Sequence, residues 1–235
     1  MKLRVVLLLT LSLLSVELSA QEILIDVPSA EVVAPKKILI QQQAAFTAKD
    51  INTSTTIIYG LPKDFEIGVM VYQLVFQRSS GVELDPSKPE DNPDFLINAQ
   101  KVIHLQRWLE LGIGTRSGVN AVRERRDLRF VSFSYIVSQW DITEDHKLVA
   151  GTYYANDAYA AYGTNFGVLA GFDLSIVKQK LNVVGDVTSG TNSMSVVNTG
   201  FEFFLPKEWS ITLAAQFPLP GSGNDRGAVI QITKR

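Results

Sequence analysis

The sequence contains no cysteine, and this absence excludes a disulfide framework, a thiol nucleophile and a cysteine metal site. Its only histidines are His104 and His146, and no local sequence marks a serine that either one would activate in a hydrolase triad. Lys and Arg number 22 against 24 Asp and Glu, so the basic excess of a nucleic-acid-binding protein is missing. We therefore expect neither an enzyme nor a nucleic-acid partner, and no residues stand out as ligands of a metal or a cofactor.

A long apolar helix is also missing, apart from one apolar run at the N-terminus. Lys2 and Arg4 form a short basic start, residues 5–14 are mostly apolar, and small residues lead up to Ala20. The apolar run is shorter than the ~20 residues that a membrane-spanning helix needs. The pattern predicts a secretory signal peptide over 1–20 with cleavage after Ala20, and an uncleaved anchor helix is the alternative.

The rest of the chain, from 65 to 232, reads as a series of short strands with two different faces. Side chains on a strand alternate between faces with a period of two residues. One face is apolar, while the other consists mostly of Gly, Ser, Thr, Asn and Ala with isolated charges. A soluble sandwich would carry many Lys and Glu residues on its second face. A small and polar second face suits the lumen of a closed barrel whose outer wall meets lipid. The apolar faces include Leu109, Leu111 and Ile113; Phe166, Val168, Ala170, Phe172 and Leu174; and Trp209, Ile211, Leu213 and Phe217.

We expect an extended periplasmic segment over 21–36, with a partial lumen plug as its alternative, and one barrel domain over 37–235. Short and long connections alternate between the expected strands. Outer-membrane barrels have short periplasmic turns and longer external loops, so an even strand number leaves both termini in the periplasm. The expected strands are 37–47, 53–60, 64–77, 95–105, 107–118, 128–141, 146–156, 164–175, 181–189, 194–205, 209–217 and 226–233.

In these features the chain resembles bacterial outer-membrane β-barrel proteins of the small porin or transporter kind. The resemblance covers the signal segment, the alternating strands and turns, and the closing hairpins formed by 182–190, 196–205 and 209–218. It departs from them at the end of the chain, which finishes on Lys234 and Arg235 and not on an aromatic residue. The resemblance implies an all-β fold, a single antiparallel up-and-down transmembrane β-barrel of about twelve strands with both termini periplasmic. It also implies localisation in the bacterial outer membrane, with the lipid bilayer, periplasmic chaperones and the assembly machinery of that membrane as partners.

Charged residues on the small-residue faces should point into the lumen, since Arg or Lys facing lipid at mid-depth costs roughly 2–4 kcal/mol. They suit either a network that plugs the lumen or a narrow polar path that selects solutes by charge. The first function expected is a narrow channel or transporter for small solutes of unknown identity. The alternatives are a closed structural or surface-interaction barrel acting through its external loops, and a soluble exported β-sandwich that binds a ligand. The expected lumen-lining residues are Glu110, Arg116, Asp173, Asp186 and Glu202.

Overall fold

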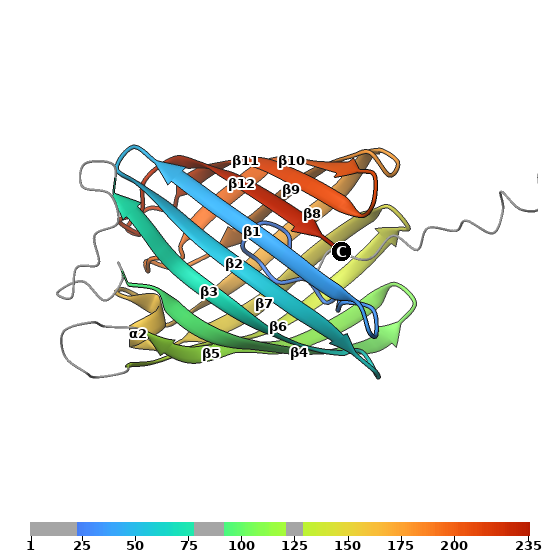
Figure 1. Ribbon diagram of the computed structural model, residues 1–235, viewed down its shortest axis with the longest axis horizontal. Coiled ribbons are helices and arrows are strands. Elements are labelled where there is room, and N and C mark those ends of the chain that lie inside the picture. The colour runs from blue at the N-terminus through green and yellow to red at the C-terminus, as the bar shows by residue number, and fades with distance from the viewer. Residues whose placement is uncertain (1–22, 78–91, 121–128) are drawn as a thin grey trace, which may run out of the picture.

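The computed structural model describes residues 23–77, 92–120 and 129–235, which form a closed antiparallel β-barrel (Figure 1). Each strand pairs with its neighbours in sequence, and β12 closes the ring by pairing with β1. Closure leaves no strand edge unpaired, as a barrel in hydrocarbon requires. The strands are β1 Ile38–Thr47, β2 Asp50–Leu61, β3 Phe65–Gln77, β4 Asp94–Gln106, β5 Leu109–Asn120, β6 Arg129–Thr143, β7 His146–Ala155, β8 Phe166–Val177, β9 Leu181–Thr188, β10 Val196–Leu205, β11 Trp209–Pro218 and β12 Gly227–Lys234.

The outer wall of the barrel is apolar along most of its height. Because successive residues on a strand face opposite sides, large apolar side chains on β8 alternate with buried residues such as Gly167 and Asp173. β6 departs from the expected pattern, because its apolar Val131, Phe133 and Val137 are buried while Ser134 is exposed. This is the surface of a barrel whose wall meets lipid. Exposed side chains of the outer wall include Ile40, Ile57, Val69, Ile97, Ile113, Ile136, Leu148, Val168, Phe201, Leu213 and Ile230.

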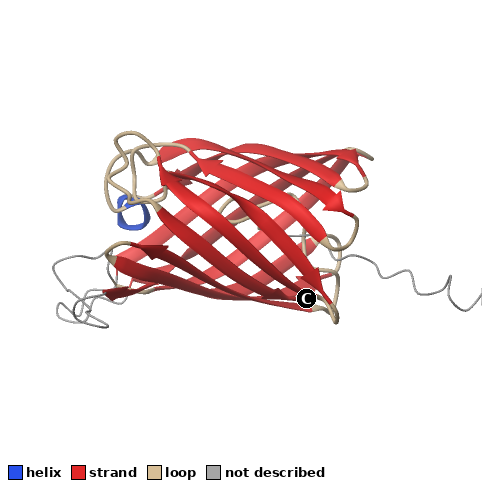
Figure 2. Cartoon of the chain, turned by 90° about the horizontal axis from the view of Figure 1, so that it is seen from above, coloured by secondary structure: helices blue, strands red, loops and turns tan. Residues whose placement is uncertain are grey.

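The two ends of the barrel differ in their connections. At one end, here called the short-turn end, strands join by two or three residues. Lys63 and Asp64 there take positive φ angles of 63° and 55°, as tight hairpin turns demand. The opposite long-loop end carries the other connections, including α2 (Asp157–Ala160), although β1 and β2 join there tightly. Figure 2 shows α2 and the longer loops at one end and the C-terminus at the other.

α2 is capped by Asn156, whose side chain accepts a hydrogen bond from the backbone N–H of Tyr159. No helix among the described residues is long and apolar enough to cross a membrane.

Residues 23–37, here called the lumen segment, lie inside the barrel ahead of β1 (Figure 1). The segment begins with a tight turn, in which the N–H of Leu24 donates to the carbonyl of Val27 at 3.0 Å. Ile23 and Pro28, on either side of this turn, form an isolated antiparallel β-bridge. Apolar side chains of this turn are buried against the inner wall. The sequence left open a periplasmic extension and a partial lumen plug. The segment occupies the position of a plug, and the extended periplasmic conformation expected over 21–36 is not observed from residue 23 onward.

The closed antiparallel barrel and its twelve strands confirm the fold predicted from sequence. The expected strand ranges agree with the observed ones to within about three residues, the largest difference being at the start of β2. The soluble sandwich is excluded, because the sheet closes on itself. The signal peptide predicted over 1–20 lies outside the described residues.

Candidate functional site

The lumen segment is held in the barrel by a buried carboxylate of β9. The Oδ2 atom of Asp186 accepts hydrogen bonds from three successive backbone N–H groups, those of Ile25, Asp26 and Val27, at 2.9, 2.6 and 2.9 Å. Successive N–H groups that converge in a turn form a concave site for an anion. Asp186 is only 4% exposed, so these bonds lie away from bulk water. One side chain of the wall therefore fixes the turn of the segment.

Asp26, at the tip of this turn, adds contacts with two further strands. Its side chain accepts hydrogen bonds from the amides of Gln43 on β1, at 2.7 Å, and of Asn198 on β10, at 2.8 Å. The same Asn198 amide also donates to Oδ1 of Asp186 at 2.9 Å. The two carboxylates are thus bridged by a neutral donor, which lowers the repulsion between them.

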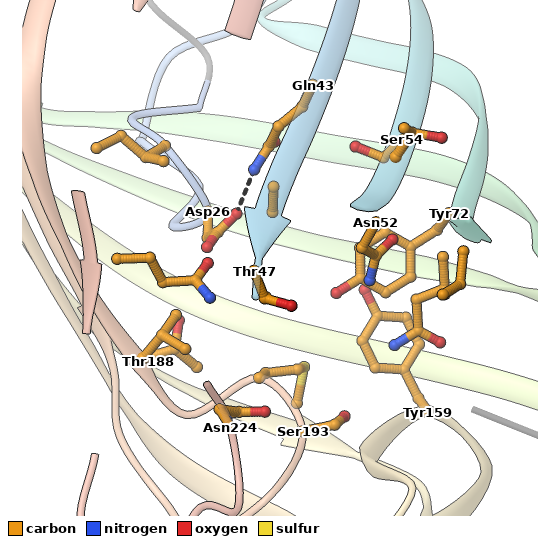
Figure 3. Close-up of a pocket in the computed structure, with 18 of the residues that line it drawn as sticks. Asp26, Gln43, Thr47, Asn52, Ser54, Tyr72, Tyr159, Thr188, Ser193 and Asn224 are labelled. Carbon is orange, nitrogen blue, oxygen red and sulfur yellow. Dashed lines mark hydrogen bonds between the residues drawn. The ribbon is translucent and has the colours of Figure 1, made fainter. Parts of the chain in front are cut away.

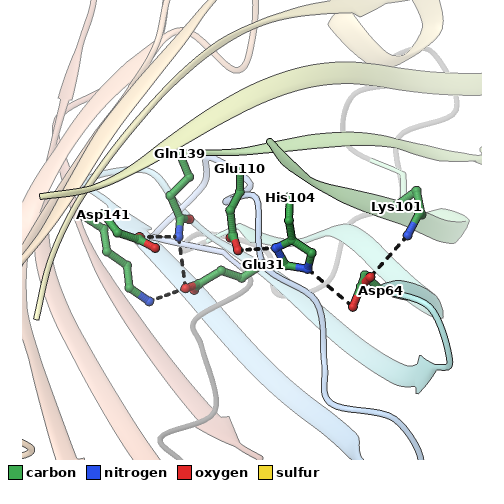
Figure 4. A network of polar contacts seen from close by, with 8 residues as sticks. Glu31, Asp64, Lys101, His104, Glu110, Gln139 and Asp141 are labelled. Atoms are coloured by element: carbon green, nitrogen blue, oxygen red, sulfur yellow. Dashed lines mark hydrogen bonds and ion pairs between the residues drawn. The ribbon is translucent and has the colours of Figure 1, made fainter. Parts of the chain in front are cut away.

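The middle of the segment binds the opposite side of the wall. The amide of Gln100 on β4 donates to the carbonyls of Ser29 and Glu31 at 3.1 and 2.6 Å. The side chain of Glu31 forms a salt bridge with Lys147 on β7 and accepts a hydrogen bond from Gln139 on β6 at 3.1 Å. Figure 4 shows Glu31 among these polar side chains of the inner wall. Asp186 and Lys147 therefore hold the segment from different strands.

The last part of the segment fits tightly against β2 and β3. The backbone N–H of Val33 donates to the buried carboxylate of Glu66 at 2.9 Å. A Cβ atom at Gly60 would lie 2.2 Å from the carbonyl oxygens of Val33 and Ala34. Only glycine allows the chain to come this close, so position 60 is matched to the lumen segment.

A cavity of about 290 Å³ lies between the turn of the segment and the long-loop end (Figure 3). We call it the chamber. Ile23, Ile25 and Asp26 of the segment contribute to its lining, while Tyr159, Ser193 and Asn224 come from the connections at the long-loop end. The intervening wall is rich in amides and hydroxyls, with Gln41, Gln43, Asn52, Ser54, Gln73, Thr188 and Gln216 among its members.

Aromatic rings line one side of the chamber. The rings of Tyr72 and Tyr159 stack with centroids 5.4 Å apart and planes inclined by 7°. Phe133 also lines this side, and the guanidinium of Arg116 lies 5.7 Å from the centroid of its ring. Burial raises the pKa of the Tyr159 phenol to about 12, so it stays neutral throughout the physiological range.

A separate group of titratable side chains lies at the short-turn end (Figure 4). His104 bonds Glu110 through Nδ1 at 2.7 Å, and its Nε2 lies 3.6 Å from a carboxylate oxygen of Asp64. Lys101 pairs with the other oxygen of Asp64 at 3.6 Å. Among the described residues, no group of three or more His, Asp or Glu side chains is arranged to hold a metal ion.

The five residues expected to line the lumen contact different partners. Glu110 bonds His104 near the short-turn end, and Arg116 lines the chamber. Asp173 accepts a hydrogen bond from Asn182 at 2.6 Å. Asp186 binds the lumen segment, and the fully buried Glu202 lies 3.4 Å from the guanidinium of Arg235. The last four are at most 6% exposed, and the side chain of Glu110 is 18% exposed.

Sequence reasoning missed several residues of the site. Asp26 and Glu31 belong to a segment without strand periodicity, so alternation could not assign them to the lumen. Gln100, Gln139 and Lys147 lie on strands, but their neighbours Lys101, Ser138 and His146 are polar, so alternation gave no clear signal for them. Among the described residues, acidic side chains of the interior outnumber basic ones. The acids are Asp26, Glu31, Glu66, Asp94, Glu110, Asp173, Asp186 and Glu202, and the bases are Arg116, Lys147 and Arg235.

No protein-family model and no curated protein matches this sequence. Solved structures do match the barrel. The KdgM porin aligns over 84% of this chain and 98% of its own, with a TM-score of 0.60 and 9% identity. The chain shares its fold with porins. The NanC porin aligns over 84% of this chain and 98% of its own, with a TM-score of 0.57 and 8% identity.

A second KdgM structure, which contains disordered oligogalacturonate, aligns equally well. At such low identity the likeness shows the fold alone. Both neighbours are named as porins, which are channels and not enzymes.

Proposed function

We propose that this protein is an outer-membrane channel for small polar solutes and that the lumen segment, residues 23–37, is its gate. The apolar outer wall and the porin fold support a membrane channel. The proposal of a gate is supported by the position of the segment in the lumen. Asp186 binds its turn, and Lys147 binds its middle. Solutes pass when the segment moves away from at least one of these two side chains.

The orientation follows from the way such barrels are inserted. The short-turn end, with the C-terminus and the start of β1, faces the periplasm, and the longer connections face outward. The proposed signal peptide 1–20 exports the chain, and cleavage after Ala20 leaves two residues before Ile23. Periplasmic chaperones and the assembly machinery of the outer membrane then act on the mature chain.

The acidic interior argues against a polyanionic solute. Oligogalacturonate, present in one KdgM structure, is a chain of carboxylates. In this lumen, such a chain would meet Asp26, Glu31, Asp173 and Glu202 with few cations to bind it. Like charges at short range repel strongly in an interior of low dielectric constant. The proposed solutes are therefore uncharged or positively charged.

A closed structural or surface-interaction barrel remains the second candidate. The buried hydrogen bonds that Asp186, Glu66 and Gln100 make with the lumen segment favour it, because each must break before the segment moves. Such a barrel would act through the connections at its long-loop end. The two candidates differ in whether the protein ever conducts.

A reversible cross-link between segment and wall tests the gate. A Cβ at residue 112 would lie 3.3 Å from the Cβ of Ala30, somewhat less than the ~3.8 Å of a disulfide, so the segment must shift by a small amount for the bond to form. The double variant Ala30→Cys/Gly112→Cys carries the chain's only cysteines, so only this bond can form. In planar bilayers we expect wild type to conduct, and the oxidised double variant to be closed until a reductant opens it.

The single variants Ala30→Cys and Gly112→Cys control for the substitutions themselves. Conduction by a fully cross-linked protein would contradict the proposal that the lumen segment is a gate, but it would still agree with the proposal of a channel. Absence of conductance in wild type and in the reduced variant would instead support the closed barrel.

A further inference from the structure

We propose that the chamber is a binding site for a small organic cation, a solute that combines an ammonium group with a short chain. This inference rests on the proposed function, because the chamber lies between the long-loop end and the lumen segment, where an entering solute arrives first. It adds the chemical class of that solute. Charge, aromatic lining and size each support it.

The charge of the chamber is the first argument. Asp26 and Asp50 both line it, and neutral groups donate hydrogen bonds to their carboxylates: Gln43 and Asn198 to Asp26, and the hydroxyl of Thr47 to Asp50. Neutral donors stabilise a carboxylate without cancelling its charge.

The other charges of the lining do not reverse this balance. A third acid of the lining, Asp225, forms a salt bridge with Lys49 at 2.8 Å. Among the described residues, the lining contains one cation, Arg116, whose guanidinium lies over the ring of Phe133. The chamber therefore has a net negative charge, which favours entry and retention of a cation.

The stacked tyrosines are the second argument. An aromatic face attracts a cation within about 6 Å of its centroid, and the attraction grows when the site is shielded from water. The rings of Tyr72 and Tyr159 lie side by side on one wall of the chamber, as Figure 3 shows. Tyr159 is buried against the rings of Tyr72 and Phe133, whereas Tyr72 is only half-buried. The ring of Tyr72 and the carboxylates of the lining together provide two kinds of contact that an ammonium group uses.

Size is the third argument. A volume of about 290 Å³ corresponds to roughly ten water molecules. It is at the lower limit of cavities that hold drug-sized ligands, so the fitting solutes are small. The amides of Gln41, Asn52 and Gln216 remain as hydrogen-bonding groups for the solute's second polar end.

Three probes of equal chain length separate charge from shape: putrescine, a four-carbon dication; 1,4-butanediol, its neutral counterpart; and succinate, a four-carbon dianion. Isothermal titration calorimetry on the full folded protein in detergent measures each. We expect putrescine to bind about tenfold or more tightly than butanediol, because charge-assisted hydrogen bonds are roughly twice as strong as neutral ones. Succinate should not bind.

Variants then locate the site. Asp26→Asn and Asp50→Asn should each weaken putrescine binding about tenfold, through loss of one charged partner. Tyr72→Leu should weaken it about threefold, while Tyr72→Phe, which keeps the ring face, should bind like wild type. Asp145→Asn is the matched control, because Asp145 pairs with Lys178 at the other end of the barrel, and it should bind like wild type. Circular dichroism and heat-modified gel migration check that every variant is folded.

Each outcome decides the inference. Equal binding of butanediol or succinate, or unchanged putrescine binding in both Asp26→Asn and Asp50→Asn, overturns it. Absence of putrescine binding to a protein that conducts in bilayers overturns the inference and leaves the channel. Putrescine binding that depends on Asp26 and Asp50 in a protein that never conducts upholds the site and overturns the channel.

Discussion

The Oδ2 atom of Asp186 lies 2.9 Å from the backbone nitrogen of Val27, although 159 positions separate the two residues in the chain. Asp186 reaches Val27 only when β9 has taken its place in the closed ring. The N–H groups of Ile25 and Asp26 bind the same oxygen, so the carboxylate is well satisfied by backbone donors. Closure of the barrel and the position of the lumen segment are thereby linked through one side chain.

Replacing Asp186 with Asn should loosen the lumen segment. The substitution halves the number of acceptor oxygens and removes the charge, and buried N–H groups left unpaired cost roughly 1–3 kcal/mol. We expect the free energy of unfolding to fall by about 2 kcal/mol and conductance to rise. Urea unfolding and planar-bilayer recording measure the two effects. Asp173→Asn is the control, because Asp173 is comparably buried but bonds Asn182 on the wall. Equal behaviour of both variants would contradict the role given to Asp186.

Lys147→Met should destabilise the protein by removing the cation that pairs with Glu31. Glu31 is 9% exposed, and loss of one partner of a buried ion pair typically costs about 3 kcal/mol. The double variant Lys147→Met/Glu31→Gln should recover part of this loss, because no uncompensated charge then remains. Chemical unfolding of the wild type, both single variants and the double variant gives the coupling energy. A coupling near zero would show that the pair does not hold the segment.

The cost of an arginine substitution on the outer face of β6 should depend on how deep the substituted position lies in the lipid. Ile136 and Ile142 are both exposed and lie on the same face, Ile136 near the middle of the strand and Ile142 beside the short turn. Ile136→Arg should cost about 2–4 kcal/mol of folding free energy in lipid vesicles, and Ile142→Arg at most about 1 kcal/mol. Equal costs at both positions would be incompatible with a lipid-facing wall.

The acidic interior should make any conductance cation-selective. In a KCl gradient the reversal potential should indicate preference for K⁺ over Cl⁻. The preference should weaken as salt rises from about 0.1 M to 1 M, since the Debye length falls from about 10 Å to 3 Å. Planar-bilayer recording at both salt concentrations measures it. Preference for Cl⁻ would contradict the charge balance of the lumen.

Alternation along β8 predicted which side of the wall each residue occupies, whereas on β6 the apolar Phe133 and Tyr135 are buried inside and Ser134 is exposed. On β8, Phe166 and Val168 face outward and Gly167 and Asp173 face inward, as their positions in the sequence predict. This works because the period of two is a local property of an extended backbone. The inward direction expected for the five charged residues rests on the same signal.

Tertiary structure decided what those inward side chains do. The lumen segment has no strand periodicity, and its partners Asp186, Lys147 and Glu66 come from separate strands that meet across the lumen only after the ring has closed. These contacts across the lumen depend on the tilt and stagger of all the strands together. Alternation therefore predicted much of the wall of this barrel, while closure of the ring decided that its own N-terminal segment lies in the lumen and leaves a chamber beyond it.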